Sequence, residues 1–291
     1  MFEKTVRVRS GENLTIKVVE PPLTEYSERS PDSGLVNWLW TEIKQEVISG
    51  AMKPWLYTPY AIGEIDGELV GSLAYYTATY NHEVGLIQFV ETAKHHRSKG
   101  IASALISTLI EKFNSEGGLA LMLCTSNPIA GSLYEKHGFW YSIGDGLRYL
   151  APGSENYDET FFAHNGKAEV REATWADLPY ISALYNHVEP RWLVKDSLTG
   201  MFRDMRYESH FVKMMGRVGE GKGGYFVLHN PKNRIVGVAV FERIDSYQEQ
   251  HVANLSFRVV PSYFDQTKEL IDWVASIAAE LSVGILQVCI G

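Results

Sequence analysis

The 291-residue sequence predicts an α/β protein of two similar domains, each a mixed, mostly antiparallel central sheet flanked by helices, with the second domain truncated. Two observations predict this fold. Segments with apolar residues at every second position alternate with segments in which apolar residues recur every three or four positions, as in strands and helices. A glycine in a similar apolar run also recurs 166 residues later, as Gly71 in ELVGSLAY and Gly237 in RIVGVAVF. We interpret this recurrence as an internal duplication.

The first predicted domain, residues 1–150, opens with alternating apolar residues that indicate one or two strands before a proline pair. Residues 30–52 then predict a helix with Gly50 as its stop, because their apolar residues recur at helical spacing and glycine is typical of helix ends. Two further apolar runs meet at Asp66-Gly67, a dipeptide typical of a hairpin turn. The domain therefore starts with strands on both sides of one helix.

The rest of this domain alternates strands with helices. A strand over residues 83–93 leads into a glycine-containing turn and a helix over residues 100–118. An apolar strand over residues 119–126, a helix over residues 127–138 and a final strand pair follow. The predicted order of the first domain is β, α, β, β, β, α, β, α, β.

A polar stretch, residues 151–166, is the expected linker to the second domain, residues 167–291. The second domain repeats the pattern with a strand, a helix opened by Thr174 or Asp177, a hairpin and another strand. It stops at the strand VGILQVCIG, before any counterpart of the last helix and strand pair. We expect the exposed sheet edge to be covered by the first domain, by the linker or by a second subunit in a homodimer.

The composition excludes several classes of protein. A hydrophobic content of 45% with 21% charged residues is typical of a globular protein, and no apolar run is long enough for a signal peptide or a membrane span. The formal net charge of −8 argues against nucleic acid as a partner and favours a cationic or amine-bearing one. Only two cysteines are present, so we expect a reduced, cytoplasmic setting, with no disulfide framework and no metal site.

The stretch KHHRSKGIASALI, residues 94–106, has the features of an anion site. A strand leads into Arg97-Ser98-Lys99-Gly100 and then directly into a helix, so backbone N–H groups and the positive end of the helix dipole converge at one point. Gly100 permits a positive φ or the close approach of a phosphate. The small Ala102 leaves room for a large group on the helix end.

These residues resemble the pyrophosphate loop of the GNAT acetyltransferase superfamily, which reads Arg or Gln, two residues, Gly, one residue, then Gly or Ala. Arg97, Gly100 and Ala102 match this pattern. The family continues with an Asn at the head of the next helix and a Tyr seven residues later, before a Gly-Phe pair. Asn127 and Tyr134 match here without a gap, followed by Gly-Phe at positions 138 and 139.

The resemblance implies an acetyl-CoA co-substrate and assigns roles residue by residue. A splayed strand would bind the pantetheine arm and the thioester through its backbone, and the loop and helix start would bind the pyrophosphate. The Tyr134 hydroxyl would protonate the departing thiolate of CoA, for which a phenol is a plausible acid. The residues assigned to CoA are Val90, Glu91, Thr92, Arg97, Ser98, Lys99, Gly100, Ile101, Ala102, Ser103, Asn127 and Tyr134.

The general base departs from the pattern. Some family members carry a Glu five residues before the Asn, and this sequence has Met122 there, which cannot accept a proton. Glu91 and Glu83 are the nearest carboxylates on the strand that lines the site, and either could act directly or through water. Alternatively, an amine that binds in its neutral form needs no side-chain base, because water carries the proton away.

The resulting hypothesis is an acetyl-CoA-dependent N-acetyltransferase in which a primary amine of a small molecule attacks the thioester directly in a ternary complex. Two alternatives stay open: a non-catalytic acyl-CoA-binding or sensing module, and a peptide or protein amine as acceptor. Family members build the acceptor pocket from the first helix and the loop after it. Here these segments contain the aromatic residues Trp38, Trp55 and Tyr57, which are our candidates for substrate binding.

The second domain is predicted to have lost the CoA loop. Our alignment of the two domains places Gln266, Glu269 and Ile271 at the positions of the loop arginine, glycine and alanine. A carboxylate and a branched side chain would then stand where a phosphate needs access to the backbone. We therefore expect the second domain to be a structural or substrate-covering domain that binds no CoA.

Overall fold

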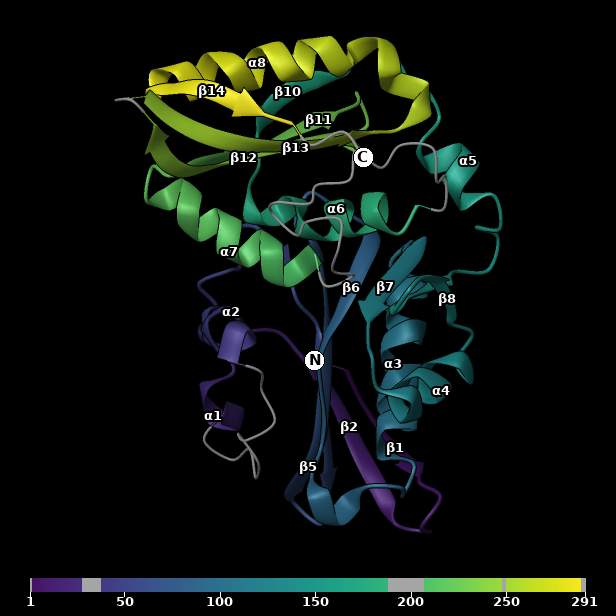
Figure 1. Cartoon of the computed structure of the whole chain (residues 1–291). Helices are drawn as coiled ribbons and strands as arrows, with labels where there is room; N and C mark the ends of the chain where they lie inside the picture. Colours follow the sequence, from purple (N-terminus) through teal and green to yellow (C-terminus); the bar gives the residue numbers. More distant parts are fainter. Residues whose placement is uncertain (1, 28–37, 188–206, 248–249, 289–291) are drawn as a thin grey trace. The chain divides into compact units, whose positions relative to one another are not determined.

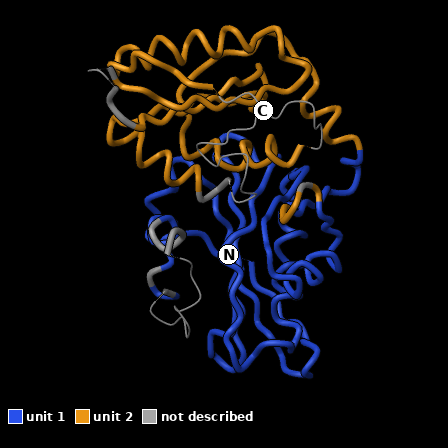
Figure 2. Tube along the Cα trace, viewed as in Figure 1, with its two compact units in different colours: residues 1–141, 147–155 blue, residues 142–146, 156–291 orange. Residues whose placement is uncertain are grey.

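The computed structural model describes residues 2–27, 38–187, 207–247 and 250–288. The chain divides into two compact units, which we call unit 1 (residues 1–141 and 147–155) and unit 2 (residues 142–146 and 156–291) (Figure 2). No helix among the described residues is both long enough and apolar enough to cross a membrane. Each unit contains its own sheet with helices on both faces, which confirms the predicted α/β class (Figure 1).

The nine-stranded sheet of unit 1 has the strand order β1-β2-β4-β5-β6-β7-β9-β8, and β3 pairs separately with β5. Helices α1 and α2 lie on one face of this sheet and α3 and α4 on the other (Figure 1). The strands are β1 (Phe2–Arg7), β2 (Asn13–Val19), β3 (Leu56–Tyr57), β4 (Tyr60–Ile65), β5 (Glu68–Ala78), β6 (Asn81–Thr92), β7 (Ala120–Cys124), β8 (Trp140–Ile143) and β9 (Gly146–Leu150). The helices are α1 (Thr24–Ser27), α2 (Trp38–Ser49), the 3₁₀ helix η2 (Lys94–His96), α3 (Ile101–Ser115) and α4 (Pro128–Glu135).

Local sequence signals account for the turns of unit 1. Helix α2 ends where predicted, at Gly50, whose φ of +85° is the left-handed conformation that glycine adopts at low cost. The β4–β5 hairpin turns at Asp66 and Gly67, with φ values of +49° and +81°, as in the two-residue turns that match the twist of the strands. The start of the predicted first helix, residues 30–37, lies outside the described residues.

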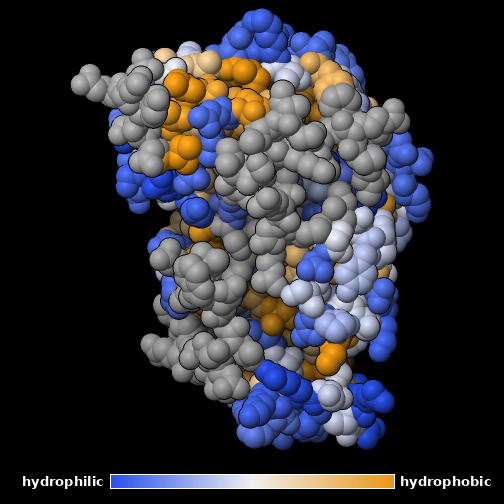
Figure 3. Space-filling model, in the orientation of Figure 1, coloured by the Kyte–Doolittle hydropathy of each residue, from blue (hydrophilic) through white to orange (hydrophobic). Residues whose placement is uncertain are grey.

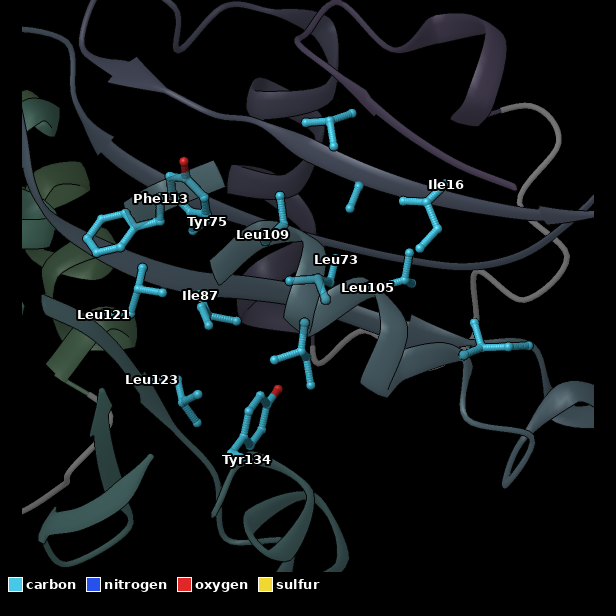
Figure 4. Close-up of a cluster of buried hydrophobic side chains, with 14 of the residues drawn as sticks. Ile16, Leu73, Tyr75, Ile87, Leu105, Leu109, Phe113, Leu121, Leu123 and Tyr134 are labelled. Carbon is cyan, nitrogen blue, oxygen red and sulfur yellow. The ribbon is translucent and has the colours of Figure 1, made fainter. Parts of the chain in front are cut away.

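The main core of unit 1 lies between the sheet and α3 (Figure 4). Leu105, Leu109 and Phe113 are spaced four residues apart along α3, so they share one face of the helix and pack toward the strands. Each of them is at most 1% exposed. Complete burial of such a side chain contributes about 1.5–3 kcal/mol, so this face holds α3 against the sheet. A second cluster on the opposite face includes Tyr60 and Ile48.

The five-stranded sheet of unit 2 has the order β10-β11-β12-β13-β14, with α8 on one face and α6 and α7 on the other (Figure 1). Its strands are β10 (Glu169–Glu172), β11 (Gly223–His229), β12 (Ile235–Tyr247), β13 (Gln250–Val259) and β14 (Val283–Gln287). Its helices are α5 (Tyr157–Phe161), η3 (Trp175–Asp177), α6 (Leu178–Tyr185), α7 (Tyr207–Gly219), η5 (Pro261–Gln266) and α8 (Thr267–Glu280).

The start of α6 uses both residues that the sequence suggested. Thr174 and Asp177 form a reciprocal capping box around η3, which continues into α6. The Asp177 carboxylate is fully buried, and Arg171 donates to both of its oxygens at 2.7 Å. The paired guanidinium and the backbone donor satisfy a buried charge that would otherwise be costly.

The stretch predicted as a linker contains a helix. Helix α5 buries Tyr157 and Phe161, and the Phe161 ring stacks on Tyr180 of α6 at 6.0 Å between centroids. Residues 156–166 therefore belong to the body of unit 2. Composition did not indicate this, because the aromatic residues of α5 are interspersed with polar ones in a run too short to show a period.

The two units share a strand arrangement. In each, a four-stranded path, β4-β5-β6-β7 or β11-β12-β13-β14, ends with a helix crossover into a parallel strand pair. Gly71 pairs with Thr92 in unit 1, and Gly237 pairs with Val259 in unit 2. Among the described strands, β14 pairs only with β13, and apolar surface gathers over it (Figure 3).

Our sequence alignment of the two helix starts is wrong by three residues. The residue immediately before α3 is Gly100, and the residue immediately before α8 is Gln266, so Gln266 rather than Glu269 stands at the position of the loop glycine. The loop arginine then corresponds to Tyr263. The spacing of apolar residues did not show at which residue α8 begins, because η5 runs directly into α8 and extends the helical pattern toward the N-terminus.

Candidate active site

Strand β6 separates from β7 halfway along its length. The two strands pair in parallel at Val84, Gly85 and Leu86 only, whereas β6 stays paired with β5 as far as Thr92. The backbone groups of residues 88–92 that face β7 therefore have no ladder partner among the described strands. Unpaired strand N–H and C=O groups are hydrogen-bonding sites for an extended ligand.

A bulge marks the start of this splayed segment. Ser72 of β5 pairs with Glu91 and Ala74 pairs with Gln88, so two residues of β6 oppose one of β5. Phe89 lies in the bulge with a φ of +57°, which is uncommon for a residue with a side chain. The bulge directs the Phe89 side chain into the cluster on the face of α1 and α2.

The predicted pyrophosphate loop meets α3 with an uncapped helix start. Gly100 precedes the helix with a φ of +93°, and no side chain in the described part of the chain caps the first-turn N–H groups. A Cβ at Gly100 would lie 3.3 Å from the backbone nitrogen of Arg9, so both the conformation and the space favour glycine. Free first-turn N–H groups and the helix dipole make this end of α3 a binding site for an anion.

The basic side chains of the loop hold its ends. The Arg97 Nε donates to the backbone oxygen of Thr92 at 3.2 Å, which ties the loop to the end of β6. The Lys99 ammonium lies 3.2 Å from Glu12 Oε1. Ser98 has a φ of +64°, so two of the three residues before Ile101 are left-handed. The loop shape thus depends on backbone conformation more than on charge.

His137 connects α4 to the start of α3. Its Nε2 lies 2.8 Å from the Ser103 hydroxyl and its Nδ1 lies 3.3 Å from the Ser107 hydroxyl. Burial lowers the pKa of this imidazole below its usual value. The folded protein therefore contains a neutral His137 at neutral pH, in contact with Ser103, one of the residues assigned to the pyrophosphate.

We expect replacement of His137 with glutamine to weaken the acid sensitivity of stability. A histidine whose pKa is lowered on folding binds more protons in the unfolded state than in the folded state. Its contribution to the free energy of unfolding is therefore present above the unfolded pKa, about 6.5, and is lost as the pH falls through the folded pKa. The melting temperature of the variant, measured from pH 7 to pH 5, should fall less than that of the wild type. His95→Gln, at an exposed position, is the control, and identical slopes for wild type and His137→Gln would contradict this.

Asn127 caps α4 with its side-chain oxygen. The Oδ1 atom accepts from the backbone N–H groups of Ile129 at 3.0 Å and of Ala130 at 3.5 Å. This capping fixes the orientation of the amide and leaves its exposed Nδ2 as a hydrogen-bond donor. The role assigned to Asn127 is therefore that of a donor.

Tyr134 lies two turns farther along α4, in the core cluster beside Leu123 (Figure 4). The residue is 5% exposed, and its ring meets Phe139 edge-on at 5.5 Å between centroids. Burial raises the pKa of the phenol well above its usual value, so Tyr134 carries its proton at neutral pH. Among the described residues its hydroxyl has no hydrogen-bond partner, which leaves the proton available to a bound group.

The two candidate bases lie far apart. Glu91 is on the splayed part of β6, where its Oε1 forms an ion pair with the Lys44 ammonium of α2. Glu83 is at the start of the strand, eight residues earlier, which corresponds to about 26 Å of extended chain. Met122 is fully buried on β7. Of the carboxylates considered from sequence, only Glu91 shares the splayed segment with Val90 and Thr92.

Two of the three aromatic candidates for acceptor binding, Tyr57 and Trp55, do not lie at this segment. The Tyr57 hydroxyl donates to Glu116 at 2.8 Å, and Glu116 follows the last residue of α3, about 22 Å from the loop end of that helix. Trp55, which is 37% exposed, adjoins the same strand β3. Trp38 begins α2, and its side chain lies outside the described residues.

Sequence reasoning missed Lys44 and Phe89. Lys44 adjoins the buried stripe of α2 but is separated from Glu91 by 47 residues, so no local pattern links the two. Phe89 appears in sequence as one more apolar residue of a strand, since a bulge leaves no compositional mark. The described residues contain no cluster of three or more His, Cys, Asp or Glu side chains suited to a metal ion.

Residues 23–139 match the model of the family described as "Acetyltransferase (GNAT) family". No curated protein matches the chain. Among solved structures, the "GNAT domain of S. lividans PAT" is 15% identical, with a TM-score of 0.40, and the match covers 51% of this chain and 96% of that one.

Two further structures resemble part of the chain. N-acetylglutamate synthase from Neisseria gonorrhoeae, complexed with coenzyme A and L-arginine, is 16% identical, with a TM-score of 0.35, over 48% of this chain and 33% of that one. Spermidine/spermine N-acetyltransferase SpeG from Vibrio cholerae is 18% identical, with a TM-score of 0.34, over 47% of this chain and 92% of that one. The residues that match the GNAT acetyltransferase family, 23–139, include the splayed strand, the loop before α3 and the tyrosine of α4.

Proposed function

We propose that unit 1 transfers an acetyl group from acetyl-CoA to a primary amine of a small molecule, by direct attack in a ternary complex. The observation that carries this proposal is the uncapped start of α3 beside the splayed half of β6. An anion site and a row of unpaired strand groups adjoin each other, which suits a ligand with a diphosphate at one end and amide groups along its length. Acetyl-CoA would supply the activated acyl group as its thioester.

The chain would provide binding, orientation and one proton. Backbone N–H groups from Gly100 to Ser103 would bind the pyrophosphate, and the backbone of Val90 to Thr92 would bind the pantetheine arm. The amine nitrogen forms a bond to the carbonyl carbon, and the carbon–sulfur bond breaks. Tyr134 would give its proton to the departing thiolate, which suits a phenol that is protonated at neutral pH.

The ammonium formed on the nitrogen must also lose a proton. Glu91 is the carboxylate on the splayed segment, and it would accept this proton directly or through a water molecule. Met122 cannot take part. An acceptor that arrives as the free amine would need no side-chain base, and the rate would then follow the fraction of neutral amine.

We also propose that unit 2 is a degenerate copy of unit 1 that binds no CoA. The Gln266 side chain, at the position of Gly100, accepts from the backbone N–H of Ala168 at 2.8 Å and is 8% exposed. The Tyr263 hydroxyl, near the same helix start, accepts from the backbone N–H of Asn165 at 2.7 Å. Both side chains are thus bound to the backbone of residues 165–168, and Gln266 has a side chain at the position where unit 1 has a glycine.

The position of Glu91 also differs in unit 2. Arg258 pairs with the residue after Gly237, as Glu91 pairs with the residue after Gly71. Its guanidinium donates to the backbone oxygen of His187 at 3.0 Å, beyond the end of α6. A cation bound to backbone carbonyls cannot accept a proton, which supports a structural or substrate-covering role for this unit.

Two measurements test the proposal. Titration calorimetry should give one acetyl-CoA site per chain, and CoA release should be observed with members of a panel of small amines, amino acids and peptides. Two sites per chain would contradict the degenerate role of unit 2. Binding of acetyl-CoA without CoA release from any amine would instead favour a non-catalytic binding or sensing module, and release with peptides alone would identify a peptide amine as the acceptor.

A further inference from the structure

Lys44 of α2 and Glu91 of β6 form a pair of opposite charges with little exposure to solvent. The Lys44 ammonium contacts Glu91 Oε1, and the two side chains are 13% and 17% exposed. Glu91 is the first paired residue after the bulge, on the segment that leaves β7. The pair therefore adjoins the backbone that the proposed function assigns to the thioester.

Stability does not explain this pair. Removing two charges from water costs several kcal/mol per ion, and the attraction between them often only offsets that cost. The described residues of the same unit contain a second such pair, Lys17–Glu64, with side-chain exposures of 25% and 8%, on strands away from the splayed segment. A partly buried pair next to the reaction centre instead provides two opposite charges at fixed positions.

Aromatic rings form the surface beneath the pair. The Lys44 ammonium lies 5.9 Å from the centre of the Phe89 ring. The Tyr60 ring is nearly parallel to Phe89 at 6.1 Å, and the Tyr76 ring meets it edge-on at 6.1 Å. The rings exclude water from one side of the charges.

We propose that the acceptor is a zwitterion with the amine and the carboxylate on the same carbon, an α-amino acid, whose amine binds Glu91 and whose carboxylate binds Lys44. This inference rests on the proposed function and specifies its acceptor. The two charges of an α-amino acid are close together, so they fit between Lys44 and Glu91 when this pair separates. The carboxylate of the ligand would then replace Glu91 beside Lys44, and its ammonium would replace Lys44 beside Glu91. The bound ammonium transfers one proton to Glu91, which releases it to water, and the neutral nitrogen then attacks the thioester. Glu91 accepts the second proton that the nitrogen loses as the amide forms, and Tyr134 protonates the departing thiolate.

The same geometry argues against polyamines as acceptors. A diamine presents a second cation near the first, and the Lys44 ammonium would repel it in a site with little access to water. The net charge of −8 attracts cations in general, but it does not distinguish one amine from another at the site.

The test compares acceptors that differ only in the carboxylate, such as phenylalanine with phenethylamine and leucine with 3-methylbutylamine. For wild type, we expect kcat/KM to be at least about tenfold higher for the amino acid of each pair. Lys44→Met should remove this preference by raising KM about 10- to 100-fold more for the amino acids than for the matching simple amines. Lys17→Met, which breaks the other partly buried pair, should keep the preference.

Two further variants keep the result interpretable. Lys44→Arg should retain most of the preference because it keeps the charge, and Lys44→Gln serves if the methionine variant does not fold. Retained acetyl-CoA binding shows that each variant is folded at the CoA site. Equal rates for both members of each pair in wild type, or equal losses for both in Lys44→Met, would overturn the amino-acid assignment alone. Transfer to none of the amines would overturn the proposed function together with it.

Discussion

Replacement of Tyr134 with phenylalanine is expected to lower kcat for acetyl transfer by about 10²- to 10⁴-fold, the usual contribution of a positioned general acid. The hydroxyl is absent from the variant, so the thiolate of CoA must leave without a proton from the chain. Acetyl-CoA affinity should change little, because Tyr134 is 5% exposed and the phenylalanine ring keeps its contact with Phe139. Steady-state kinetics and calorimetry on the same preparations measure the two quantities separately.

Tyr149→Phe provides the matched control. Tyr149 belongs to the same core cluster. Its ring lies tilted against Phe139 at 5.5 Å between centroids, and its hydroxyl accepts a hydrogen bond from Asn114 at 2.9 Å. Loss of that hydroxyl should cost about 1 kcal/mol of stability and leave kcat unchanged. If Tyr134→Phe turned over as fast as wild type, the assignment of Tyr134 as the acid would be wrong.

Replacement of Ala102 with glutamate should weaken acetyl-CoA binding by about 10- to 1,000-fold. A carboxylate about 4 Å from a phosphate costs on the order of 1–4 kcal/mol, depending on how much water separates them. Position 102 is preferable to Gly100 for this test, because Gly100 has a positive φ and lies against Arg9, so any side chain there strains the loop. A glutamate in the first turn of α3 is favourable for the helix itself.

Ala102→Gln separates charge from size, since glutamine has nearly the shape of glutamate. Calorimetry should show a much smaller loss of affinity for the glutamine variant, and thermal melts should show that both variants are folded. Equal acetyl-CoA affinity in wild type and Ala102→Glu would show that the pyrophosphate does not bind at this end of α3.

The parts of the fold that could be predicted from sequence are those with local causes. Helix α3 shows a clear helical period, and the β4–β5 turn follows from Asp66-Gly67, whose conformations depend on neighbouring residues only. The loop before α3 was also predicted from local sequence, because Gly100 and Ala102 matter for their small size, which the sequence shows directly. Asn127 and Tyr134 lie on one short helix, so their spacing in sequence corresponds to their spacing in the structure.

Prediction was poorer where distant segments meet. The sequence suggested Tyr57 for the acceptor pocket, but β3 pairs with the end of β5 where α3 terminates, and Glu116 binds its hydroxyl. The counterpart of the loop glycine is Gln266, because the helix start is defined by backbone conformation and not by apolar spacing. Each difference comes from which strand or helix end a segment meets.

The sequence by itself determined the order of strands and helices in unit 1, the open helix start at Gly100 and the tyrosine of α4, since all three depend on contacts within a few residues. Only the tertiary structure decided that β6 leaves β7 after Leu86 and that Lys44 of α2 meets Glu91. Both depend on contacts between segments more than 30 residues apart in sequence, formed when the two faces of the sheet are covered. The Lys44–Glu91 pair and the unpaired backbone groups of β6 therefore lie next to each other only because of how these segments pack.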